Sequence, residues 1–138
     1  MPWLVYAVLS ALFAAVTAIL AKLGVEGVPS NLATAVRTAV VLVFAWGIVF
    51  AGGEHQKLAG ISAKSYGFLA LSGIATGCSW LAYFKALQLG PASRVAPVDK
   101  LSLPLTIVLS AVVLSEPIGW RIALGVLLIA GGALLTIQ

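Results

Sequence analysis

Four ionisable side chains lie inside stretches of this sequence that are otherwise apolar: Arg37, Lys85, Asp99 and Lys100. At 1.5 Å per residue along a helix, Arg37 lies roughly 8 Å, Asp99 about 10 Å and Lys100 about 12 Å below one membrane surface. Lys85 lies near the same surface. Charged groups are costly in hydrocarbon, and those found there usually face a bundle interior or water and have a function. The sequence therefore predicts a charged substrate-binding or coupling cluster in one half of the bilayer.

The expected pairing within this cluster follows from helix geometry. Asp99 and Lys100 are neighbours, about 100° apart around a helix, so we expect Asp99 to pair with Arg37 or Lys85 on another helix. The cations outnumber the single anion, which favours a substrate with a carboxylate or phosphate. In the alternative interpretation, Arg37 and Lys100 extend their side chains to the membrane surface.

Two rows of polar side chains follow helical spacing and add to the candidate site. The first row is Ser72, Thr76, Ser79 and Tyr83, and the second is Asp99, Ser102, Thr106 and Ser110. Each row lies on one helix face, which predicts either hydrogen bonding between helices or a hydrated pathway. Trp80, beside the first row, is a candidate wall of a substrate cavity or a core residue.

Two prolines, Pro97 and Pro104, are expected to kink the segment that carries Asp99 and Lys100. Proline has no N–H, so Pro104 cannot bond to the carbonyl of Lys100 four residues earlier. A free carbonyl in a membrane requires water, a side chain or a ligand. We expect an unpaired Lys100 carbonyl beside the charged pair.

The elements that must position these residues are membrane helices. The chain has 138 residues, of which 62% are hydrophobic and only 9% charged, whereas soluble domains have about 25% charged residues. Five apolar runs each approach the length of about 20 residues that crosses a bilayer; they cover approximately 2–21, 32–51, 66–87, 92–115 and 118–137. The predicted fold class is an all-α integral membrane protein with five transmembrane helices in one domain, 1–138.

The distribution of basic residues predicts an unusual topology. An odd number of spans puts the termini on opposite sides. Lys57, Lys64 and Arg121 lie near one surface, and Lys22, Lys85 and Arg94 near the other. Because this balance gives orientation little bias, we expect dual topology, with the chain acting as one inverted-repeat unit in an antiparallel homodimer. The alternative is a fixed topology in a parallel oligomer.

The last predicted span differs from the others in having no polar side chain between Arg121 and Thr136. Its Gly125 and Gly132 are seven residues apart, on one face, where they allow another helix to approach closely. They are candidates for dimer packing or for packing within the chain.

Several classes of function are not expected. The basic residues are scattered rather than gathered on a soluble face, which argues against nucleic-acid binding despite the net charge of +4. His55 stands alone, and no Ser/His/Asp set, metal-ligand cluster or phosphate-binding loop is visible. We expect no enzyme activity, no metal and no cofactor.

Three segments carry a family resemblance: "ILAKLGVEGVPSNLATAVRT", "YFKALQLGPASRVAPV" and "LSEPIGWRIALGVLLIAGGALL". Together they resemble one EamA-type repeat of the drug/metabolite transporter superfamily. Larger members carry two such repeats in ten spans, so the resemblance implies pairing of two five-helix units. It also implies secondary export, by alternating access, of a small metabolite or amino-acid-like compound across a prokaryotic inner (plasma) membrane. Arg37 and Glu116 match positions that usually carry these residues in the family.

A partial similarity to small multidrug resistance transporters concerns the last helix, where that family pairs antiparallel protomers through two glycines seven apart. That family also depends on a glutamate in the first span, which this chain lacks, so its proton/cation exchange chemistry is not carried over. Two alternatives to an exporter are a membrane subunit that does not transport and a flippase for a lipid-linked sugar.

Overall fold

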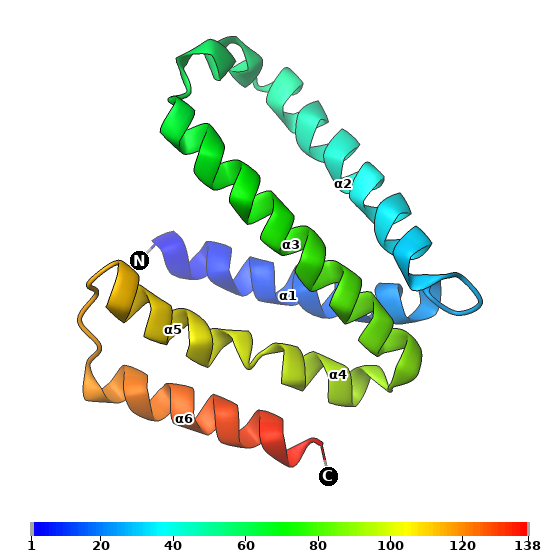
Figure 1. The fold of residues 1–138 in the computed structure, drawn as a ribbon, viewed down its shortest axis with the longest axis vertical. Coiled ribbons are helices and arrows are strands. Elements are labelled where there is room, and N and C mark those ends of the chain that lie inside the picture. The colour runs from blue at the N-terminus through cyan, green and yellow to red at the C-terminus, as the bar shows by residue number, and fades with distance from the viewer. Residues whose placement is uncertain (1, 138) are drawn as a thin grey trace. The chain divides into compact units, whose positions relative to one another are not determined.

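The computed structural model describes residues 2–137 and is helical, with no strand among these residues (Figure 1). In chain order the elements are α1 (Pro2–Gly24), α2 (Ser30–Ala51), the 3₁₀ helix η1 (Glu54–Gly60), α3 (Ala63–Leu89), α4 (Ala92–Asp99), α5 (Ser102–Val113) and α6 (Trp120–Leu135). The predicted all-α fold class is confirmed.

Four segments are long and apolar enough to cross a membrane: α1, α2, α3 and the stretch Ala92–Val113, which combines α4 and α5. The predicted fifth span is shorter than expected, because α6 has 16 residues and rises only roughly 24 Å. The helix begins only at Trp120, because Pro117 and the extended backbone of Gly119 precede it. Five complete spans therefore stay a prediction.

The chain divides into two compact units, one of them made of two separate stretches of sequence. The first unit contains most of α1 together with α4, α5 and α6, and in it α6 packs antiparallel to α4 and α5 (Figure 1). The second unit is Ala21–Gln88, in which α2 and α3 form an antiparallel hairpin and η1 packs on α2 (Figure 1).

The break between α4 and α5 falls at the expected place but has different bonding. The Lys100 carbonyl accepts a hydrogen bond from the Leu103 N–H at 3.0 Å, so the predicted unpaired carbonyl is wrong. Pro104 has no N–H to offer, and the backbone tightens into a 3₁₀-type turn in which a donor one residue earlier takes its place. The kink thus consists of a short turn with its hydrogen bonds made.

Buried residues in the second unit gather where α1 ends, α2 begins and α3 ends. They are Ala21, Val25, Ser30, Thr34, Phe84 and Leu87. Most other large apolar side chains of residues 2–137 are exposed, as suits helices whose surroundings are lipid. The packed core of this unit is therefore small and lies at one end.

Two long polar side chains tie this end together. The Gln88 Nε2 atom donates to the backbone carbonyls of Val25 and Val28, and the Lys22 Nζ atom donates to the Leu87 carbonyl at 2.6 Å. The last carbonyls of a helix have no partner within it, so Lys22 satisfies one of those of α3. We call this arrangement, made by Lys22, Val25, Val28, Leu87 and Gln88, the hydrogen-bonded corner.

Helix α5 ends on a left-handed residue. Ser115 has φ of 55°, which lets the Glu116 N–H turn back to the Ser110 carbonyl at 3.3 Å. Glycine is the usual residue at this position of a helix end, because a Cβ is disfavoured there. Pro117 follows and prevents the helix from continuing.

Replacing Ser115 by glycine is expected to stabilise the protein. A left-handed conformation costs an L-residue roughly 1–2 kcal/mol, and the greater freedom of unfolded glycine offsets roughly 0.5–1 kcal/mol of this. Thermal unfolding in detergent, followed by circular dichroism, should show a higher midpoint for Ser115→Gly. The matched variant Ser115→Ala keeps a Cβ and should not show it; equal midpoints for both variants would contradict the prediction.

Removing the amide of Gln88 is expected to weaken the hydrogen-bonded corner. Gln88→Met keeps the length of the side chain but removes the donor to the Val28 carbonyl and one of the two donors to the Val25 carbonyl, a loss of about 1–3 kcal/mol. The same thermal unfolding measurement should show a lower midpoint. Gln56→Met in η1 changes an exposed side chain and serves as the control, which should stay close to wild type.

Candidate functional site

Arg37 lies two turns into α2 and stacks on aromatic rings of α3. Its guanidinium carbon is 4.1 Å from the centroid of the Trp80 ring and 5.4 Å from that of Phe84. Trp80 and Phe84 are four residues apart and so lie on one face of α3. We call these two rings the aromatic platform. A guanidinium over an indole face is held by cation–π attraction of roughly 0.5–2 kcal/mol.

The hydrogen-bonded corner holds one half of this platform in place. Phe84 is 3% exposed and Leu87, in the next turn, is fully buried. Tyr83 packs edge-on against Phe84, with ring centroids 6.5 Å apart. Arg37, Trp80, Tyr83 and Phe84 therefore form one cluster within the second unit.

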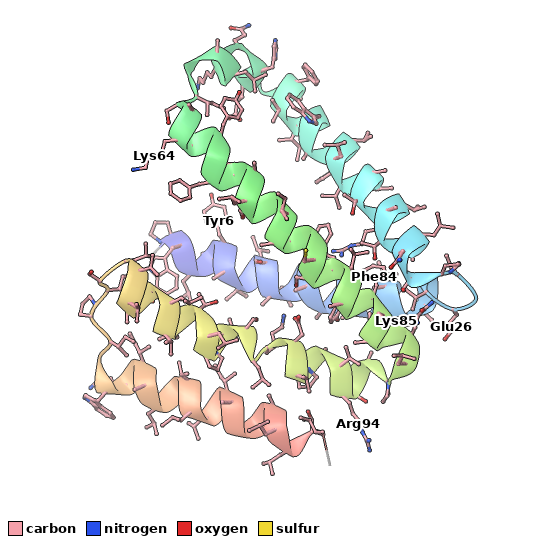
Figure 2. All side chains as sticks on the ribbon, viewed as in Figure 1. Tyr6, Glu26, Lys64, Phe84, Lys85 and Arg94 are labelled. Atoms are coloured by element: carbon pink, nitrogen blue, oxygen red, sulfur yellow. The ribbon has the colours of Figure 1, made fainter. Side chains whose placement is uncertain are left out.

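Lys85 follows Phe84 in sequence but has a different environment. Figure 2 shows Phe84, Lys85 and Glu26 at the same end of the second unit, with Lys64 at the opposite end of α3. Lys85 is exposed. Lys85 is therefore adjacent to Phe84 in sequence, but its side chain is exposed and is not part of the aromatic platform.

The expectation that Asp99 and Lys100 do not pair with each other is wrong. The Asp99 Oδ2 atom lies 3.1 Å from the Nζ atom of Lys100, its neighbour in sequence. Asp99 ends α4 and Lys100 follows it with helical backbone angles, so the long, flexible side chain of Lys100 bridges the divergence of about 100° between neighbouring residues. Both stay partly exposed, at 34% for Asp99 and 52% for Lys100. Pairing of Asp99 with Arg37 or Lys85 stays a prediction, because these residues belong to different units.

The four predicted charged residues divide between the two units. Arg37 and Lys85 belong to Ala21–Gln88, and Asp99 and Lys100 to the other unit. The structure describes the arrangement within each unit, but not between the two. Convergence of all four on one site stays a prediction.

The hydroxyl rows bond mainly to their own helices. Thr76 donates to the Ser72 carbonyl at 2.9 Å, Thr106 to the Ser102 carbonyl at 2.8 Å and Ser110 to the Ile107 carbonyl at 3.0 Å. Such bonds use the hydroxyl hydrogen and leave the oxygen lone pairs available. Ser72, Ser79 and Ser102 are exposed. For Thr76, Thr106 and Ser110, the predicted hydrogen bonds between helices are not what the structure shows.

The glycines of α6 have open space beside them. A Cβ built on Gly125 or Gly132 would meet no atom within 4 Å. Neither glycine is therefore required by close packing among residues 2–137, although α6 contacts α4 and α5 elsewhere. The face with Gly125 and Gly132 remains available to a helix of another molecule.

Sequence reasoning missed the roles of Lys22 and Gln88. A basic residue in the last turn of a helix often binds terminal carbonyls, so the position of Lys22 carries a partial signal. The bonds of Gln88 reach carbonyls 60 and 63 residues away, and no local sequence pattern predicts them. Among residues 2–137 there is no group of three or more His, Cys, Asp or Glu side chains that could hold a metal ion.

Comparisons with known proteins agree with the helical membrane architecture. The model of the EamA-like transporter family matches residues 1–138. A protein from Sinorhizobium sp., described as an uncharacterized transporter in the cobO 3′ region, is 50% identical over 133 residues, which are 96% of this chain and 94% of that protein. No solved structure matches the chain.

Proposed function

Because the chain belongs to the EamA-like transporter family, we propose that it is a secondary transporter exporting a small metabolite or amino-acid-like compound. Membership makes it an integral membrane transporter, and its apolar helices fit that setting. The class of substrate and the export direction are the proposal. The observation that carries it is the charged break in the fourth candidate span.

This break has the features of a transport site. Backbone that leaves the helical path at membrane depth is tolerated where it is buried in protein or lines a water-filled cavity. Transporters commonly place their substrate sites at such discontinuous helices. Here the break carries an ion pair between Asp99 and Lys100 that is partly exposed, and an unsolvated pair would be costly in lipid.

The polar row along α5 extends this site. Ser102 opens the helix and is followed on the same face by Thr106 and Ser110. Oxygen lone pairs on this face can accept hydrogen bonds from water or from a polar substrate. A path of acceptors that begins at an ion pair supports movement of a polar compound rather than a purely structural role.

We further propose that two chains pair antiparallel and move by alternating access. Two supports are the single five-helix repeat of the family and the balanced distribution of basic residues. The third is the open face of α6 around Gly125 and Gly132, which allows close approach of a second helix. A bacterial relative supports placement in a prokaryotic plasma membrane.

Replacing Asp99 by asparagine is expected to reduce export at least about tenfold, because the change removes the only anion at the break and leaves Lys100 unpaired. The measurement is uptake of a panel of radiolabelled amino acids into inverted membrane vesicles. Glu54→Gln removes a charge from η1, outside the candidate spans, and is the control. Unchanged transport by Asp99→Asn would sink the proposed site, and no transport by the wild type would favour a non-transporting subunit.

Dual topology predicts that a single cysteine at the C-terminal end, in a Cys78→Ser background, is labelled from both sides of the membrane. An impermeant maleimide applied to intact cells and to inverted vesicles tests this. Glu54→Lys in η1 and Glu26→Lys in the α1–α2 connection add charge at opposite ends of α2 and should bias labelling in opposite directions. Labelling from one side only, unmoved by either variant, would establish a fixed topology.

A further inference from the structure

The guanidinium of Arg37 lies over aromatic rings and has no polar partner in the described part of the chain. The rings of Trp80 and Phe84 lie against it, while among residues 2–137 no hydrogen bond or ion pair of this side chain occurs. We propose that Arg37 on its aromatic platform is a binding site for an oxyanion with two coplanar oxygens, a carboxylate or a phosphate.

Stacking and hydrogen bonding use different parts of a guanidinium. Its N–H donors all lie in the plane of the group, so a ring against the face leaves the donor edge free. That edge matches the spacing of two oxygens of a carboxylate or phosphate and binds them bidentately. Arg37 therefore retains its N–H donors for such a ligand, since no hydrogen bond or ion pair uses them among residues 2–137.

The site is also preorganised. Phe84 is buried at 3% exposure, and the turn that follows it is fixed by the Lys22 bond to the Leu87 carbonyl. A receptor whose supporting residues are locked loses less entropy when its ligand binds. Arg37 consequently packs against an aromatic platform that is held in place, rather than against a mobile side chain.

The local charge favours an anion. At this end of the unit, Lys22, Arg37 and Lys85 outnumber Glu26, and Glu26 is not bonded to Arg37. Exposed Lys85 lies next to Phe84 in sequence and adds to the positive potential at this end of the unit (Figure 2). An approaching oxyanion would be attracted before it meets the guanidinium.

Two sources could supply this oxyanion. Arg37 lies roughly 10 Å along α2 from Ser30, within the reach of a lipid phosphate, while an amino-acid-like substrate would bring a carboxylate. The substrate source rests on the proposed function; the binding site itself does not. The experiment must therefore measure binding apart from transport.

The fluorescence of Trp80 can report on ligand binding at Arg37, which lies over its ring. Replacing Trp3, Trp46 and Trp120 by phenylalanine leaves Trp80 as the sole tryptophan. The protein, in maltoside detergent, is titrated with sodium acetate, sodium phosphate or dihexanoyl phosphatidylglycerol, against sodium chloride at equal ionic strength. We expect a saturable change in Trp80 fluorescence with at least one of the three probes.

Arg37→Lys keeps the charge but loses the planar donor edge, and should weaken binding at least about tenfold. Arg121→Lys makes the same change at an arginine in the other unit, whose guanidinium lies 5.4 Å from the ring of residue 120 in the native chain, and should leave the Trp80 titration unchanged. Circular dichroism checks the fold; if Arg37→Lys is misfolded, Arg37→Gln replaces it, with the same expected loss.

The outcomes separate the possibilities. Saturation by acetate or phosphate identifies a soluble anion, and saturation by the short-chain lipid alone identifies a headgroup; both support the site. No saturable response, or equal binding by a folded Arg37 variant, would overturn it. Anion binding by a protein that transports none of the amino-acid panel would sink the proposed function and keep the site, and the reverse result would sink only the site.

Discussion

The second unit depends on hydrogen bonds between the end of α3 and the connection from α1 to α2. Helix ends and loops carry backbone groups without partners, and such groups are costly away from water. Gln88 and Lys22 donate to the carbonyls of Val25, Val28 and Leu87, of which that of Val25 also accepts the Val28 N–H, and the side chains of Val25 and Leu87 are buried here. The rest of the α2–α3 hairpin has few buried residues, so this end fixes where Phe84 and Trp80 lie and hence where Arg37 finds its platform.

The break between α4 and α5 solves a related problem by different means. Proline removes a backbone donor, and the chain compensates with a tight turn that reuses the Leu103 N–H. Asp99 and Lys100 form an ion pair at this same turn. The irregular backbone and the ion pair thus form one structural feature of this apolar segment, in which each lowers the free-energy cost of the other.

The sequence predicts the broad architecture well because membrane helices are specified by long apolar runs, and four of the five runs form helices of spanning length. It also places the break near Lys100, since Pro97 and Pro104 act locally. It misses the ion pair between Asp99 and Lys100, because the angular separation of neighbouring residues takes no account of the reach of a lysine side chain. The platform for Arg37 and the bonds of Gln88 join residues distant in sequence, and one sequence carries no signal for such pairs.

The hydroxyls of Thr76, Thr106 and Ser110 donate their hydrogens to backbone carbonyls of their own helices. What each presents outward is therefore an oxygen that can only receive. A molecule or water chain that contacts Thr106 and Ser110 on α5 must therefore donate the hydrogen bond, whereas the exposed hydroxyl of Ser102 can still donate one itself. At Thr106 and Ser110 the face favours ammonium and hydroxyl groups, which can donate to it, over carboxylates, which cannot.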